Sequence, residues 1–303
     1  MNQQPKKQIW TWVPSLYFAE GLPYAMVMIV SVIMYKKLGL SNTDIALYTS
    51  WLYLPWVIKP LWSPIVDIFR TKRFWIVTMQ LLIGAGLAGV AFTIPSSDPL
   101  KYTMALFWLL AFSSATHDIA ADGFYMHALS SHDQAWMIGI RNTFYRFAIL
   151  FGQGLLVMFA GMMEFWTGNV TTAWSVTFGV LAGLFIIFSI YHRWMLPVPS
   201  SDYRHSNLKL SEAVRNFFQV FISFFKKPKI SLVIIFILFY RFGEAQLVKI
   251  APLFILDSLE AGGLGLTTIE LGFATGTLGM IMLTIGGITG GFFAAKHGLK
   301  AWI

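Results

Sequence analysis

Ionisable side chains sit inside stretches of this sequence that are otherwise apolar. Glu20 interrupts an apolar run from Ile9 to Met34, within the segment YFAEGLPY. A charged side chain at the centre of a lipid bilayer costs about 2.5–3.5 kcal/mol on insertion scales, so it requires a partner, water or a function. Gly21 and Pro23 follow Glu20 and loosen the backbone hydrogen bonding, which is tolerated beside protein or a water-filled cavity.

Other charges lie at comparable depth in later apolar segments. Asp118 and Asp122 are four residues apart in SSATHDIAADGFY and therefore share a helix face. Arg141 and then Arg146 follow in the next apolar segment, so we expect ion pairs between the two segments. Lys59, close to the inner end of an earlier segment, is expected only to extend its ammonium group to the membrane surface.

A further acid and base, Arg241 and Glu244, are three residues apart and could pair within one helix. Opposite charges gathered at one depth favour a water-filled cavity for a polar, charged solute over isolated packing ion pairs. A carboxylate removed from water holds its proton more tightly. Such a group could exchange a proton near neutral pH, as a proton-coupled carrier requires.

The composition places these residues in a membrane protein. Of the 303 residues, 56% are hydrophobic and 12% are charged, with a mean hydropathy of +0.64, whereas soluble domains carry about 25% charged residues. The sequence contains no cysteine, which excludes disulfides and thiolate metal sites. Apolar stretches of about 20 residues can cross a bilayer as helices. We count eight, at 10–34, 43–65, 74–94, 102–124, 136–161, 172–196, 230–254 and 268–294.

The distribution of the 22 basic residues predicts the orientation. With the N-terminus in the cytoplasm, fourteen lysines and arginines fall on the inner side, and only Lys36, Lys37 and Lys101 fall on the outer side. This bias follows the positive-inside rule. The net charge of +8 is therefore an orientation signal and gives no reason to expect nucleic-acid binding.

A polar break divides the chain. We expect a six-helix transmembrane half over 1–196, a cytoplasmic linker over 197–228 and two further transmembrane helices over 229–303. Within the linker, apolar residues recur at helical spacing from Leu210 to Phe225 beside basic ones. This pattern predicts an amphipathic helix on the inner membrane surface, with a ninth short span as the alternative.

The segments LGLSNTDIALYT and LGLTTIELGFAT indicate an internal duplication. They begin at residues 38 and 264, align without a gap at an offset of 226, and agree at four of 12 positions, with five more similar. Each places Ser or Thr before an acid three residues on, which is the capping-box pattern at the start of a helix. Each also follows a span that contains a glutamate, so the seventh span repeats the plan of the first.

Three other patterns are weaker. The GAGLAG segment matches a dinucleotide-binding fingerprint but lies in an apolar helix with no preceding strand. His127, His132 and Asp133 could suggest a metal, yet they fall in an expected turn, where solvated side chains are the simpler interpretation. His117 and Asp122 have the H-x-x-x-x-D spacing of some acyltransferases, which keeps a membrane-embedded enzyme as an alternative.

Taken together, four segments resemble the AmpG-like muropeptide permeases, a branch of the major facilitator superfamily: LWSPIVD (61–67), SATHDIAAD (114–122), YRFAILFGQG (145–154) and FYRFGEAQ (239–246). More distantly, the chain is similar to acetyl-CoA transporters. The resemblance implies an all-α membrane protein with the major facilitator fold, which is built from two six-helix halves. Because that fold has twelve spans, we expect this chain to be truncated to eight.

The resemblance also implies a function. Such carriers bring anhydro-muropeptides released in cell-wall turnover across the bacterial inner membrane, driven by the proton gradient. We therefore expect a monomeric proton symporter, with a muropeptide-like solute, protons and the lipid bilayer as partners, and with no cofactor, metal or catalytic residue. A carrier for another polar solute, such as acetyl-CoA or peptides, and a non-transporting sensor are the alternatives.

Site roles follow from the matching positions and from the charge pattern. Four acids are expected to couple to protons or to sense charge: Glu20, Asp118, Asp122 and Glu244. Five side chains are expected to bind the solute, the arginines through a carboxylate and the tyrosines through a sugar: Tyr24, His117, Tyr145, Arg146 and Arg241. A gating role is expected for Asp67, Arg70, Lys72, Arg73 and Arg141.

His117 departs from the family pattern, which usually has glutamine before the first aspartate of this pair. An ordinary histidine titrates near pH 6.5. The role of His117 therefore stays open between solute selection and proton coupling.

Overall fold

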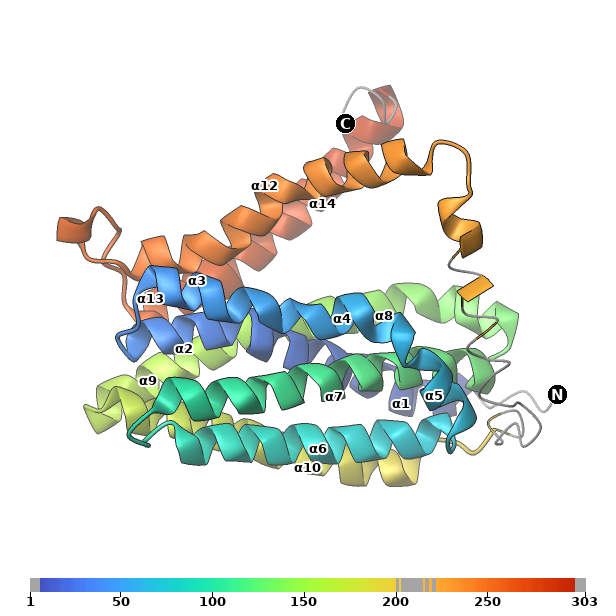
Figure 1. Ribbon diagram of the computed structural model, residues 1–303, viewed down its shortest axis with the longest axis horizontal. Helices are drawn as coiled ribbons and strands as arrows, with labels where there is room; N and C mark the ends of the chain where they lie inside the picture. Colours follow the sequence, from blue (N-terminus) through green and yellow to red (C-terminus); the bar gives the residue numbers. More distant parts are fainter. Residues whose placement is uncertain (1–5, 200–201, 203–214, 216–217, 220–221, 298–303) are drawn as a thin grey trace.

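The computed structural model describes residues 6–199, 202, 215, 218–219 and 222–297, and every regular element in these ranges is a helix (Figure 1). The expected all-α fold is confirmed. The predicted linker helix, from Leu210 to Phe225, lies mostly outside the described residues. The division into a six-helix half, a linker and two further helices stays a prediction.

Six helices within the described ranges are long and apolar enough to cross a membrane. The first span is α1 (Lys6–Ala25), which α2 (Ser31–Lys37) continues, and the second is α6 (Lys72–Thr93). The fourth span is α8 (Ser131–Phe151), which α9 (Val157–Thr167) continues. The others are α7 (Pro99–Ala128), α10 (Val170–Met195) and α12 (Ile230–Leu256). They correspond to six of the eight predicted spans.

The predicted second span is a chain of short helices in place of one long helix. It consists of α3 (Asn42–Ser50), η2 (Trp51–Tyr53), α4 (Leu54–Ile58), η3 (Lys59–Leu61) and α5 (Ser63–Ile68). Prolines occupy the first or second position of the last three of these elements. A proline has no N–H for the helical ladder, so a helix tends to restart at it.

Three helical rods pass through a π turn without ending. The turn η1 (Met26–Val30) joins α1 to α2, and η4 (Gly152–Leu156) joins α8 to α9. The turn η6 (Phe273–Leu278) joins α13 (Thr268–Gly272) to α14 (Gly279–His297), and these elements cover the residues of the predicted eighth span. Turns of this kind are frequent at functional sites, and η4 and η6 contact one another.

The helix starts of the two related segments carry the predicted caps. Ser41 accepts a hydrogen bond from the backbone N–H of Asp44 at the start of α3. Thr267 and Glu270 form a complete capping box at the start of α13. Matching caps at matching positions support the proposed duplication, because each cap satisfies N–H groups that the first helical turn leaves unpaired.

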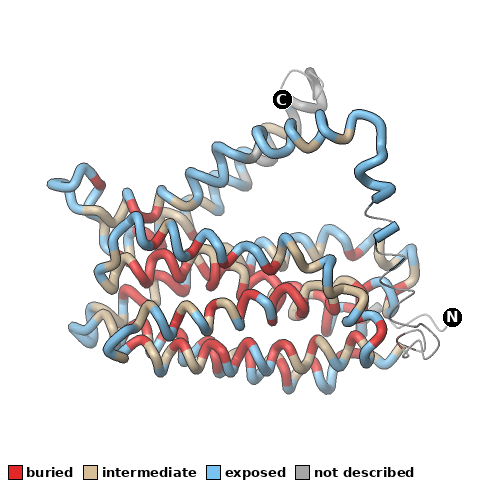
Figure 2. The backbone as a smooth tube through the Cα atoms, viewed as in Figure 1, coloured by how far each residue is buried: buried red, intermediate tan, exposed pale blue. Residues whose placement is uncertain are grey.

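Helix α1 lies at the centre of the N-terminal helices. It contacts α7, α8 and α10, and α6 packs against α7 and α10. Aromatic side chains such as Trp12, Phe107 and Trp174 are fully buried in these contacts. Figure 2 shows the buried residues concentrated in these helices, whereas α12 is exposed along most of its length.

Gly21 sets how closely α1 and α8 approach, and this contact gives a testable prediction. A Cβ atom on Gly21 would lie 2.6 Å from the carbonyl oxygen of Tyr145, so the backbone would have to move. We expect Gly21→Ala to destabilise the protein by about 1–3 kcal/mol, the usual cost of overpacking. Thermal unfolding in detergent measures this.

Gly183 on α10 provides the matched control, since a Cβ there has no neighbour within 4 Å. Gly183→Ala is expected to be neutral or to stabilise the helix by up to about 1 kcal/mol. Equal shifts in the unfolding temperature for the two variants would contradict the close approach of α1 and α8.

Candidate functional site

Three carboxyl groups meet where α1 packs against α7. Glu20 of α1 and Asp118 and Asp122 of α7 place one oxygen each within 4.8 Å of one another. Glu20 is 5% exposed, and the two aspartates are half-buried. The four-residue spacing puts both aspartates on the face of α7 that α1 covers, as expected from the sequence.

Each aspartate has its own cation. Arg141 Nη2 lies 2.7 Å from Asp122 Oδ1, which is the ion pair expected between the two segments. Lys59 Nζ forms an ion pair with Asp118. The expectation that Lys59 merely extends to the membrane surface is therefore wrong: the prolines around it turn this part of the second span inward, toward α7.

Arg141 is also held by aromatic rings. Its guanidinium lies 4.6 Å from the ring centroid of Tyr17 and 5.5 Å from that of Tyr125. The Tyr17 hydroxyl donates to Asp122 Oδ1 at 3.3 Å. Cation–π contacts of this kind strengthen as water is excluded, so Arg141 and Asp122 form a fixed pair. Arg141 is therefore a member of the charged cluster, and a gating role is also expected for it.

The cluster has one more acid than it has bases. Glu20 Oε2 is buried without a hydrogen-bond partner among the described residues, and the Glu20 carboxyl group lies within 4.8 Å of the Asp118 carboxyl group. Contact between two carboxyl groups is favourable only when one of them carries a proton. Because Lys59 and Arg141 pair with the two aspartates, Glu20 is left without an ion-pair partner among the described residues.

Aromatic side chains border the carboxyl groups. Tyr24 of α1 makes edge contacts with Trp56 and Tyr53, at centroid distances of 5.3 and 6.5 Å. Tyr145 of α8 lies within electrostatic reach of Glu20 and Asp118. The structure therefore places Tyr145 near the cluster and packs Tyr24 against Trp56 and Tyr53. The sequence analysis assigned no role to Tyr53 or Trp56. Tyr53, Trp56 and Lys59 follow one another at intervals of three residues, which is a helical signal.

His117 lies apart from the carboxyl groups, inside the helix bundle. It is 1% exposed, and its Nε2 lies 3.0 Å from Gln80 Nε2, while the other end of the Gln80 amide contacts His192 at 3.0 Å. His192 continues to Ser15 at 3.1 Å. His117 and Asp122 therefore form no dyad of the kind an acyltransferase would use.

The remaining predicted solute-binding and charge-sensing residues lie elsewhere. Arg146 is exposed and is not part of the charged cluster. Glu244 is exposed on α12. The side chain of Arg241 lies outside what the structure describes, so its expected pairing with Glu244 stays a prediction.

The predicted gating residues gather around the start of α6. Lys72 forms an ion pair with Asp67, and the guanidinium of Arg73 donates to the carbonyl oxygen of Arg193. Arg70 adopts a left-handed φ of 68° and lies 5.6 Å from the ring centroid of Phe74. Asp202, which sequence reasoning missed, accepts hydrogen bonds from the backbone N–H groups of Lys72 and Arg73 at 2.8 and 3.2 Å.

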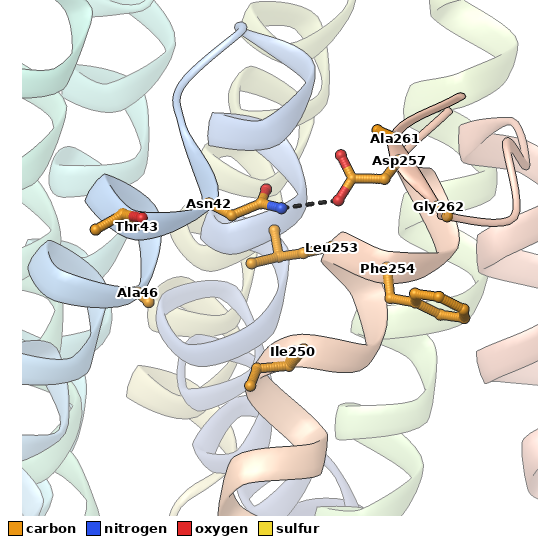
Figure 3. A pocket seen from close by; sticks show the side chains of 10 residues that line it. Asn42, Thr43, Ala46, Ile250, Leu253, Phe254, Asp257, Ala261 and Gly262 are labelled. Atoms are coloured by element: carbon orange, nitrogen blue, oxygen red, sulfur yellow. Dashed lines mark hydrogen bonds between the residues drawn. The ribbon is translucent and has the colours of Figure 1, made fainter. Parts of the chain in front are cut away.

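At the opposite end, an ion pair joins the N-terminal helices to the end of α12, and a hydrogen bond joins them to α13. Lys36 pairs with Asp257, which also accepts a hydrogen bond from Asn42 Nδ2 at 2.7 Å (Figure 3). These bonds hold the pKa of Asp257 below its usual value. A groove of about 520 Å³ lies beside them, bordered by α3, the end of α12 and the loop that follows it.

A second set of contacts at this end centres on Glu164 of α9. Lys37 Nζ lies 3.1 Å from its carboxylate, and Trp174 Nε1 and Thr268 Oγ1 each donate to it at 2.9 Å. Sequence reasoning assigned no role to Glu164 or Asp257. Their signal was the position of Lys36 and Lys37, which are two of the three basic residues on the predicted outer side.

Comparison with known proteins gives a consistent result. Residues 15–303 match the family model described as the Major Facilitator Superfamily. The anhydromuropeptide permease of Escherichia coli K12 is 26% identical over 304 residues, which cover 98% of this chain and 57% of that protein. A Rickettsia conorii protein named as an AmpG transporter is 23% identical, over 93% of this chain and 67% of its own length. The chain thus spans a little over half the length of the E. coli relative.

The Lys36–Asp257 pair predicts a pH-dependent contribution to stability. A depressed pKa means that the stabilisation is complete above about pH 4, the unperturbed value for aspartate, and is lost as the pH falls through the lowered pKa. We expect Asp257→Asn to lower the unfolding temperature at pH 7 and pH 5, and the difference from the wild type to shrink progressively as the pH falls below about 4.

Glu260→Gln is the control, because Glu260 is an exposed carboxylate in the same loop. Its unfolding temperature should follow that of the wild type at every pH. An effect of Asp257→Asn that is the same from pH 7 to pH 3 would contradict the ionic origin of the contact.

Proposed function

Because the chain belongs to the Major Facilitator Superfamily, we propose that it is a secondary transporter that moves an anhydromuropeptide-like solute together with protons. It is a multi-pass, all-helical membrane protein. The solute is proposed from the names of relatives that share 23–26% identity with it. Proposed roles for the described residues rest on the site geometry.

Proton coupling is supported by the surplus acid of the cluster. Lys59 and Arg141 leave one negative charge among Glu20, Asp118 and Asp122 to be neutralised. Glu20 is the most buried of the three, and one of its oxygens has no partner within the described residues. A buried carboxyl group that must be neutral in one state and can reach water in another binds and releases a proton as the carrier changes conformation.

The orientation is proposed from the basic residues. We place the protein in a bacterial inner membrane with its N-terminus in the cytoplasm, so that the Asp67–Lys72 region faces inward and the Lys36–Asp257 pair faces outward. The Lys36–Asp257 ion pair and the Thr268–Glu164 hydrogen bond tie the N-terminal helices to α12 and α13 at the outer end, which fits a conformation closed on that side. We propose that this outer set alternates with the inner gating residues Asp67, Arg70, Lys72 and Arg73.

Solute contacts are proposed around the cluster. Tyr145 lies near the carboxyl groups and Tyr24 packs against Trp56, and both tyrosines are proposed to contact the sugar. Arg241 stays a proposed carboxylate ligand, and Glu244 a proposed charge sensor, on the first helix after the linker. The proposed unit is a monomer made of two helical halves. The acyltransferase alternative gains no support, since His117 and Asp122 have different partners.

The role of Glu20 is tested by separating accumulation from exchange. In proteoliposomes with an imposed pH gradient, Glu20→Gln is expected to reduce accumulation of a labelled anhydromuropeptide by about 10–100-fold, the range of typical coupling free energies. Exchange of labelled for unlabelled solute without a gradient should persist, because the neutral amide imitates the protonated acid. Asp118→Asn is expected to lose gradient-driven accumulation as well.

Glu260→Gln again serves as the control and should accumulate solute as the wild type does. Full gradient-driven accumulation by Glu20→Gln would remove Glu20 from the coupling mechanism. Loss of both accumulation and exchange, with the variant properly folded in the membrane, would assign Glu20 to solute binding instead.

A further inference from the structure

The two cations of the carboxyl cluster are held very differently. Arg141 has a carboxylate partner and two aromatic rings that contact its guanidinium. Lys59 has Asp118 as its ionic partner among the described residues, and its side chain is 33% exposed. Of the two, Lys59 is therefore the cation that can change partners at the smaller cost.

The backbone at Lys59 favours such a change. Lys59 begins η3, a three-residue 3₁₀ turn whose second residue is Pro60. Ile58 before it has φ −93° and ψ 1°, and Trp62 after the turn has φ −113° and ψ 0°. Neither value is α-helical, and Pro60 offers no N–H to tie the turn to the preceding helix. A short 3₁₀ segment inside a longer rod often marks a hinge.

The surroundings of Lys59 match one kind of ligand. Trp56 and Tyr53 precede it at intervals of three residues, and both rings contact Tyr24. Tyr53 is 46% exposed. The face thus offers aromatic rings, against which the apolar C–H side of a sugar ring can lie, next to a single ammonium group that can bind a carboxylate.

We propose that Lys59 binds a carboxylate of the transported solute, and that the solute takes this position by displacing Asp118. The ligand class is a sugar that bears a carboxylate, with Tyr24, Tyr53 and Trp56 beside its ring. The proposal rests on the proposed transport function and assigns to Lys59 a part in solute selection and coupling.

The exchange balances charge. Before it, Lys59 and Arg141 neutralise the two aspartates, and Glu20 carries a proton. After it, Asp118 has no cation of its own and lies within 4.8 Å of two other carboxyl groups. The three carboxyl groups then share the one cation Arg141, so one proton from the solution enters the cluster to compensate. One carboxylate and one proton load together, and the net charge of the site is unchanged.

The proton affinity of the cluster in this step depends on the charged and titratable groups around Asp118. These groups come from α1, α7, η3 and α8: Tyr17, Glu20, His117, Asp122, Lys59, Arg141 and Tyr145. Only the Lys59 contact changes when the solute arrives. The pH dependence of solute binding should therefore follow the presence of a carboxylate on the solute.

Two forms of one probe test the proposal: an anhydromuropeptide with free carboxylates, and the same compound with its carboxylates amidated. Lys59→Met is expected to weaken equilibrium binding of the acidic form by about 10–100-fold, the usual loss for a hydrogen bond to a charged group. Binding of the amidated form should be unchanged. Lys59→Arg, which keeps the charge, should retain most of the affinity for the acidic form.

A double variant separates solute binding from simple neutralisation of Asp118. If Lys59 served only to neutralise Asp118, Lys59→Met/Asp118→Asn would regain the affinity for the acidic probe. We expect the loss to persist in the double variant. The double variant also removes the unpaired carboxylate that could unfold the single one.

The outcomes distinguish this proposal from the one on which it rests. Wild-type protein that takes up neither form of the probe would overturn the proposed transport function. Wild-type protein that takes up the probe, combined with a Lys59→Met variant that binds both forms normally or loses both equally, would overturn only the role of Lys59.

Discussion

Three carboxyl groups share a space in which the part of the chain that the structure describes places two cations. In water this imbalance would matter little, but between transmembrane helices an uncompensated charge is costly. The two cations pair with Asp118 and Asp122. Glu20 is the most buried of the three acids, and one of its oxygens has no partner among the described residues. The arrangement of α1, α7, α8 and the proline-broken second segment follows from bringing these five side chains together.

The fold was largely predictable, because the signals that determine it are local. Apolar length predicted the long helices, and the Ser or Thr before an acid predicted the caps at Ser41 and Thr267. Three prolines, Pro55, Pro60 and Pro64, also indicate that the helix of the second segment is interrupted. Hydropathy averages over such residues, so an apolar stretch of the correct length was interpreted as one uninterrupted helix.

The site was predictable only in part, because pairing depends on which helix faces which. Glu20, Asp118 and Asp122 stand out in apolar surroundings, and a spacing of four indicated a shared face for the aspartates. Nothing in the spacing shows that Asp118 takes Lys59 and not an arginine of the next helix. Asp257 and Glu164 lie at helix ends, where a charge is ordinary, and their roles emerge only from contacts more than 100 residues away in sequence.

The contact between η4 and η6 has a mechanical consequence. Here the chain touches itself backbone to backbone, since a Cβ on Gly276 would collide with the Cα of Gly154. Glu164 lies ten residues farther along the same rod, about 15 Å away. If the rod that contains Gly154 and Glu164 tilts by about 10° around the glycine contact, Glu164 moves roughly 2–3 Å relative to Thr268. That displacement is enough to break their hydrogen bond. A small rotation at the contact between Gly154 and Gly276 would thereby separate the Glu164 carboxylate from Thr268.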